Sequence, residues 1–169
     1  PVLSPQTAFI MTMLMKDVVD KGTGQAAALP DRSVAGKTGT TSNNTNAWFI
    51  GFTPDLLTAI WIGNDRQEDP MIYKEGRVSS DTAAKLWGGY MRKITQNHPV
   101  RDFTEPSGVV WADVNPETGK TTPGWFSRNS YKEVFAEENI PRGSVDKLWN
   151  DLFGWLKPKK NAPQETEEE

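Results

Sequence analysis

The chain has 169 residues, of which 36% are hydrophobic, and its formal net charge is −3. This length suits a single domain with a core of its own, and the sequence carries no basic patch that would favour a nucleic-acid partner. It contains no cysteine, which excludes disulfides and thiolate metal sites, and its one histidine, His98, cannot form a histidine metal cluster or a histidine-based triad. We therefore expect no metal and no other cofactor.

The first predicted element is a helix that begins at Pro5. Ser4 is a typical N-cap residue, and proline is favoured at the first helical position. Apolar residues then recur at helical spacing at Met11, Leu14, Met15 and Val18. Gly22 marks the end of this helix, and residues 26–33 are expected to form a loop.

Three β-rich runs follow the loop, at residues 34–41, 47–52 and 57–62. Turn-forming residues separate them, at 42–44 and 53–55. Connections this short force neighbouring strands to run antiparallel. The sequence therefore predicts a three-stranded meander, and the fold class is α+β, with an antiparallel sheet flanked by helices.

A second helix is predicted after a polar connection at residues 64–78, with Ser79 or Ser80 as its cap. Its apolar face is predicted at Ala83, Leu86, Trp87, Tyr90, Met91 and Ile94. We expect three tryptophans to lie in the core of this part of the chain, those at positions 48, 61 and 87.

Composition divides the chain into four parts. Residues 1–98 form the folded body, and residues 99–143 a loop-rich extension with one short strand at 109–114. Residues 144–157 are predicted to be an amphipathic helix, which either packs internally or docks a partner. Residues 158–169 are predicted to be a disordered acidic tail.

Two glycine-containing strings match nucleotide-binding motifs without the context that those motifs need. Gly22-x-Gly24-x-x-Ala27 follows a helix, whereas the dinucleotide fingerprint needs a strand before it and a helix after it. Gly36-Lys37-Thr38 matches the end of a P-loop, but Asp31 occupies the position of the required glycine and a strand follows. We assign the first string to a helix end and the second to a strand.

The string Lys37-Thr38-Gly39-Thr40 is compatible with one strand of an acyl-transfer site. On a strand, Lys37 and Gly39 face one way, and Thr38 and Thr40 face the other. A glycine at position 39 suits the close approach of a ligand backbone, and a strand of this kind at a sheet edge can pair with an extended peptide. Taken alone, these are also ordinary surface residues, so both interpretations stay open at this point.

The wider context closely resembles the bifunctional class A penicillin-binding proteins. The resemblance rests on VAGKTGTT at residues 34–41, WFIGFTP at 48–54 and IWIG at 60–63, preceded by Val18-Val19-x-x-Gly22-Thr23-Gly24. It covers residues 2–141. It implies that residues 1–98 are the C-terminal half of a transpeptidase domain with the penicillin-binding and serine β-lactamase-like fold, incomplete here, and that residues 99–143 are the C-terminal extension of the family. In that fold the three strands belong to a five-stranded sheet with helices on both faces.

The resemblance implies a serine acyltransferase that cross-links D-Ala-D-Ala stem peptides of peptidoglycan and is acylated by β-lactam antibiotics. The family uses S-x-x-K, S-x-N and K-T-G, in that chain order. By this resemblance, Lys37 would supply positive charge and organise the protons, while Thr38 and Thr40 would hold the substrate carboxylate beside Gly39. The backbone N–H of Thr40 would form half of the oxyanion hole. The other half belongs to the nucleophile, which we expect to lie outside this chain.

Three strings match the other family motifs, but they come after Lys37, which reverses the family order. They are Ser144-x-x-Lys147, Ser42-x-Asn44 and Ser127-x-Asn129, and we assign them to a helix cap, a hairpin turn and a loop. Asn46 stands where the family commonly has aspartate. This departure should remove a local charge and leave the docking strand unaltered.

The chain begins at Pro1 without a signal-peptide pattern, and no apolar run approaches the ~20 residues that span a bilayer. We therefore expect a fragment of a longer protein. The resemblance implies an upstream half of the same protein, which carries the nucleophile and a membrane anchor on the extracytoplasmic side, so this segment alone should be inactive. The alternative functions are a non-catalytic module that binds peptidoglycan peptides and a scaffolding appendage. S-x-x-K and S-x-N motifs upstream would select the transpeptidase.

Overall fold

The computed structural model describes residues 1–66, 69–73, 76–122 and 129–141. It divides into two compact units between Val109 and Val110. The predicted helix at 144–157, the predicted tail at 158–169 and the Ser144-x-x-Lys147 string lie outside the described residues, as does Ser127. The predicted boundary after residue 98 stays a prediction.

The first unit opens with helix α1, Pro5–Asp20, which begins where the sequence predicts. The Ser4 hydroxyl accepts a hydrogen bond from the Thr7 backbone N–H at 3.1 Å. Pro5 occupies the first turn, where its missing N–H has no helical partner to lose. The N-cap chemistry of the sequence therefore fixes the start of α1.

The buried side of α1 differs from the apolar spacing in the sequence. Phe9 and Val19 are its buried residues, whereas Met11 and Leu14 remain 45% exposed. The helical period was correct, but periodicity does not tell which part of an apolar stripe another element covers.

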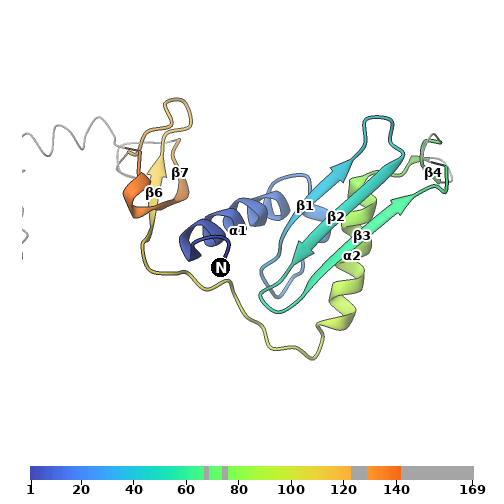
Figure 1. The fold of residues 1–169 in the computed structure, drawn as a ribbon, viewed down its shortest axis with the longest axis horizontal. Coiled ribbons are helices and arrows are strands. Elements are labelled where there is room, and N and C mark those ends of the chain that lie inside the picture. The colour runs from blue at the N-terminus through green and yellow to red at the C-terminus, as the bar shows by residue number, and fades with distance from the viewer. Residues whose placement is uncertain (67–68, 74–75, 123–128, 142–169) are drawn as a thin grey trace, which may run out of the picture. The chain divides into compact units, whose positions relative to one another are not determined.

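The predicted meander is confirmed as a three-stranded antiparallel sheet in the order β1-β2-β3 (Figure 1). The strands are β1 (Ala35–Thr40), β2 (Asn46–Phe52) and β3 (Leu57–Gly63). The β1–β2 connection contains Asn44 in the left-handed region, with φ 54°, a conformation that asparagine tolerates in turns. The further strands of a five-stranded sheet stay a prediction.

Helix α2, Ser80–Ile94, contacts all three strands and lies behind them in Figure 1. Ser79 and Thr82 form a capping box at its N-terminus. Trp87 and Phe49 are both 0% exposed and meet edge-to-face, with ring centroids 5.3 Å apart. The indole N–H of Trp87 also donates to the Thr58 carbonyl at 2.9 Å. This aromatic pair anchors the core of the first unit, because large rings bury the most apolar area per residue.

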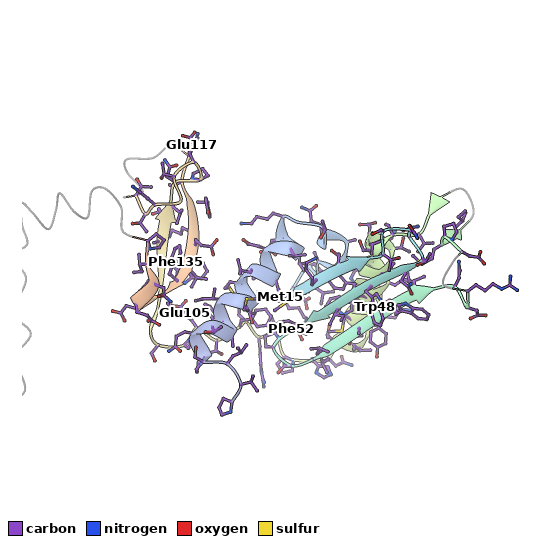
Figure 2. The ribbon with its side chains drawn as sticks, turned by 45° about the horizontal axis from the view of Figure 1, so that its top comes forward. Met15, Trp48, Phe52, Glu105, Glu117 and Phe135 are labelled. Carbon is purple, nitrogen blue, oxygen red and sulfur yellow. The ribbon has the colours of Figure 1, made fainter. Side chains whose placement is uncertain are left out.

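The prediction that Trp48 and Trp61 lie in the core is wrong. Their side chains are 42% and 51% exposed, on the sheet face opposite α2 (Figure 2 labels Trp48). Strand alternation places them there together with Ile50, and the described residues place no helix over β2 and β3 on this face. Leu86 and Tyr90 of α2, predicted on its apolar face, are also about half exposed.

The connection between β3 and α2 is more structured than the sequence predicted. It contains a small antiparallel pair, β4 (Ile72–Tyr73) and β5 (Gly76–Arg77). Met71, just before it, is 2% exposed, and its backbone N–H donates to the Asn44 carbonyl at 2.9 Å. The loop after α1 likewise contains a short 3-10 helix, Gln25–Ala27.

The second unit is built on a two-stranded sheet of β6 (Val109–Val114) and β7 (Tyr131–Ala136). The strand β6 was predicted and β7 was not. Val134 and Ala136 are the buried residues of β7, and a 3-10 helix, Glu137–Asn139, follows it. Within the described part of the chain, no helix has the length and apolar character needed to cross a membrane.

Candidate active site

The strand β1 passes from buried to solvent-exposed residues along its length. Ala35 and Gly36 are buried, whereas Lys37 and Thr40 are exposed and Thr38 and Gly39 are partly exposed. The register pairs Lys37 with Ile50 and therefore places it on the open face of the sheet. The exposed part of β1 is the Lys-Thr-Gly-Thr string that the sequence singled out.

Two residues of this string, Thr38 and Thr40, direct their backbone groups to the side of β1 that does not pair with β2. The Thr41 N–H donates to the Asn46 carbonyl at 3.1 Å, which marks a hydrogen-bonded pair at the end of the strand. Because such pairs alternate along an antiparallel ladder, the N–H and C=O groups of Thr40 and Thr38 point away from β2. That edge can therefore bind an extended peptide or an oxyanion.

The ammonium group of Lys37 lies at the same edge. It donates a hydrogen bond to the Thr38 carbonyl at 2.9 Å, within its own strand. The described residues place no carboxylate within 4.0 Å of this nitrogen. Its positive charge is thus available to an anionic ligand.

The hydroxyls of the string differ in their surroundings. The Thr38 hydroxyl lies 2.7 Å from the hydroxyl of Thr23, in the loop after α1. The Thr40 side chain is exposed to solvent. The Thr23 contact was not predicted, although Thr23 belongs to the residues that carry the family resemblance.

Gly39 and Gly36 are glycines for different reasons. A Cβ at position 36 would lie 2.6 Å from Cζ of Phe49 and 2.9 Å from the Ile50 carbonyl oxygen, which the packing cannot accommodate. A Cβ at position 39 would meet only Cβ of Trp48, at an ordinary 3.5 Å. The packing of the described residues therefore requires glycine at 36 but not at 39.

The turn after the string is held by its own polar residues. Thr41 Oγ1 accepts hydrogen bonds from the backbone N–H groups of Thr45 and Asn46, at 3.0 and 3.1 Å. The Asn46 side chain accepts from the indole N–H of Trp61 at 2.8 Å. Ser42-x-Asn44 lies in this turn, as predicted.

A second polar site precedes β1. The Arg32 guanidinium donates to both carboxylate oxygens of Asp31, at 3.2 and 2.8 Å. This pair lowers the pKa of Asp31 and raises that of Arg32, in each case mainly through the shared side-chain hydrogen bonds. Both residues line an open depression of about 480 Å³ that also contains Arg101 and Asp102. The charged side chains that line the depression are two acidic and two basic ones, so the lining has no excess charge of either sign.

Comparison with known proteins identifies the class to which this fold and strand belong. Residues 1–95 match the penicillin-binding protein transpeptidase domain. The chain therefore belongs to the penicillin-binding protein transpeptidase family, which confirms the resemblance seen in the sequence.

Within that family, the chain is similar to the class A proteins. It is 34% identical to penicillin-binding protein 1A of Pseudomonas aeruginosa over 152 residues, which cover 87% of this chain and 17% of that protein. The chain thus spans less than a fifth of this relative.

Two solved structures extend the comparison to the fold. Penicillin-binding protein 1A of Haemophilus influenzae matches with a TM-score of 0.68 at 24% identity, over 84% of this chain and 22% of that chain. The PonA1 protein of Mycobacterium tuberculosis in complex with penicillin V matches with a TM-score of 0.55 at 26% identity, over 60% of this chain and 29% of that chain. The predicted α+β transpeptidase fold is confirmed, while the roles of Lys37 to Thr40 stay predictions.

Proposed function

We propose that this chain supplies the substrate-docking strand of a D-alanyl-D-alanine transpeptidase that cross-links peptidoglycan. The observation that carries the proposal is the edge of β1. An ammonium, two hydroxyls and outward backbone groups gather there beside Gly39, a glycine that the surrounding protein does not require. A ligand backbone that lies against position 39 would explain that glycine.

In this proposal each hydrogen-bond donor of the strand has its own role toward the ligand. Lys37 provides a positive field and organises the protons of the site, while the hydroxyls of Thr38 and Thr40 hold the terminal carboxylate of the stem peptide. The Thr40 N–H stabilises the oxyanion that forms when a serine attacks the carbonyl of the penultimate D-alanine. That attack releases the terminal D-alanine, and the amine of a second stem peptide then takes the acyl group from the serine.

The nucleophilic serine and its lysine base come from residues of the longer protein upstream of this segment. The same upstream part provides a membrane anchor, so that the site faces the peptidoglycan outside the cytoplasm. Because a β-lactam carries a carboxylate beside its reactive carbonyl, it occupies the same edge as the stem peptide. One relative is described in complex with penicillin V, which supports this proposal.

The intact mass after incubation with penicillin tests the proposed function. The complete protein that contains these residues should gain the mass of one penicillin, whereas the 169-residue chain alone should gain none, because the activated serine is missing. A complete protein that stays unmodified would support the peptide-binding module instead. A stoichiometric adduct on the chain alone would mean that its own residues include the nucleophile.

A further inference from the structure

The hydroxyl contact between Thr23 and Thr38 links two segments that are 15 residues apart in sequence. Its oxygens are 2.7 Å apart, and either of them can be the donor. Thr23 belongs to the loop that follows α1, and Thr38 belongs to the docking strand. The contact is therefore a tertiary one, and it is made by Thr38, one of the two residues that the proposed function assigns to the ligand carboxylate.

The backbone around Thr23 is tightly fixed. The Gly24 N–H donates to the Val18 carbonyl at 2.8 Å, so the loop folds back onto the end of α1. A Cβ at position 24 would lie 3.2 Å from the Phe49 ring, and one at position 22 would lie 2.9 Å from Val18 backbone atoms. Thr23 thus lies between two glycines whose backbones are pressed against the protein, and its own side chain is the one directed to Thr38.

The number of available protons determines which of the two hydroxyls donates the hydrogen bond when a ligand is bound. A threonine hydroxyl has one proton to donate and two lone pairs to accept with, while a carboxylate can only accept. If Thr38 donates to Thr23, it has no proton left for the carboxylate. One arrangement satisfies all three groups, in which Thr23 donates to Thr38 and Thr38 donates to the carboxylate. Hydrogen bonds in such a chain also strengthen one another.

We propose that Thr23 is a positioning residue that directs the hydroxyl proton of Thr38 toward the carboxylate of the stem peptide or β-lactam. The inference rests on the proposed function of the docking strand. Thr23 acts through Thr38 and does not itself touch the ligand. Its side chain is exposed, so its hydroxyl adds little to the packing of the fold.

The first test compares Thr23→Val, Thr23→Ser and Thr12→Val in the complete protein, by the rate of acylation by benzylpenicillin. Valine keeps the branched shape of threonine but removes the hydroxyl, and serine keeps the hydroxyl. Thr12 is the matched control, because its hydroxyl donates to the Ala8 carbonyl within α1 at 2.8 Å. We expect Thr23→Val to slow acylation about 3- to 10-fold, as for one neutral hydrogen bond. Thr23→Ser and Thr12→Val should remain within about twofold of the parent on the same scale.

The second test asks whether Thr23 acts through Thr38 and the carboxylate. Thr23→Val should not slow acylation by benzylpenicillin methyl ester, and it should add nothing to the defect of Thr38→Val in the double variant. Equal slowing with the acid and the ester, or full additivity with Thr38→Val, would overturn the proposal and leave a structural role for the loop.

These measurements distinguish a failure of the positioning role of Thr23 from a failure of the proposed function of the docking strand. If Thr38→Val and Thr40→Val slow acylation while Thr23→Val does not, the positioning role fails and the docking strand stands. If neither Thr38→Val nor Thr40→Val has an effect, the proposed function of the strand fails, and the role of Thr23 fails with it.

Discussion

In the first two residues of β1, Ala35 is fully buried and Gly36 lies against Phe49, whereas Lys37 and Thr40 in the same strand are exposed. The buried half is constrained by the core that α2 completes. Beyond its pairing with β2, the exposed half is linked to the loop after α1 by the hydroxyl contact between Thr38 and Thr23. One short strand therefore carries a part that is buried in the core and a part that is at least partly exposed.

The two glycines of β1 show the same difference at the level of single atoms. Gly36 has no room for a methyl group, while Gly39 has room for one. A residue that is costly in a strand but is not required by packing points to a need outside the described residues. Substitutions in the two halves of β1 should therefore have separate effects, on stability for the first half and on acylation for the second.

Replacing Thr40 should give the largest loss of activity. Thr40→Val removes one hydroxyl and keeps the backbone N–H and the side-chain shape. A hydrogen bond to a charged group contributes about 1.5–3 kcal/mol, so acylation of the complete protein by penicillin should slow about 10- to 150-fold. Stopped-flow or mass-spectrometric acylation kinetics would measure this, and an unchanged rate would remove Thr40 from the carboxylate site.

The neighbouring hydroxyl provides the control for that experiment. Thr41 Oγ1 accepts two backbone N–H groups of the turn, so Thr41→Val should lower the free energy of unfolding by about 0.5–1.5 kcal/mol. The folded fraction should still be acylated at close to the parent rate. The reverse pattern, with Thr40 structural and Thr41 catalytic, would contradict the division of β1.

Gly36→Ala should act on the other half of the strand. The added methyl group would overlap Phe49 and the Ile50 carbonyl, and overpacking of this kind costs about 1–3 kcal/mol. Chemical denaturation should show the loss, while the folded fraction keeps its acylation rate. A variant as stable as the parent would mean that β1 and β2 can move apart, and the contrast with Gly39 would lose its basis.

Gly39→Ala should show the opposite behaviour. The fold has room for the methyl group, so stability should stay within about 0.5 kcal/mol of the parent or rise slightly. A ligand backbone against position 39 would meet the methyl group, so acylation should slow by about tenfold, in the lower part of the range for overpacking. If acylation is unchanged, the ligand does not approach Gly39, and the reason for this glycine lies elsewhere.

Much of the fold followed from local chemistry in the sequence. Ser4 and Pro5 located the start of α1, and the turn sequences located three strands to within a residue or two. Burial was harder to predict, because alternation in β2 separates Trp48 from Phe49 without telling which face a helix covers. The strand β7 was missed, because its charged residues hide a weak period of two.

The candidate site, like the fold, was predictable from the sequence only in part. The Lys37 to Thr40 string could be found from its residues and their neighbours, and its alternation along the strand agrees with the register. The contact of Thr38 with Thr23 could not, because it depends on the path of the loop after α1, and that path is fixed by tertiary contacts of Gly24.

The smallest effect should come from Asp31, which precedes β1 and belongs to neither half of it. Its side chain is 53% exposed, and the two hydrogen bonds from Arg32 hold its pKa below the ordinary 3.8. A lowered pKa in the folded state stabilises the protein above the unfolded pKa, and this contribution is lost as the pH falls through the folded pKa. Asp31→Asn should therefore melt slightly below the parent at neutral pH, and the difference should vanish as the pH falls through the lowered pKa of Asp31. The raised pKa of Arg32 has no effect in this range, because the guanidinium stays charged throughout.

Acylation of the Asp31→Asn variant should be unchanged at neutral pH. If the margin by which the parent melts above Asp31→Asn instead grows toward low pH, the ion pair opposes folding. If Asp31→Asn slows acylation, the docking site extends beyond β1.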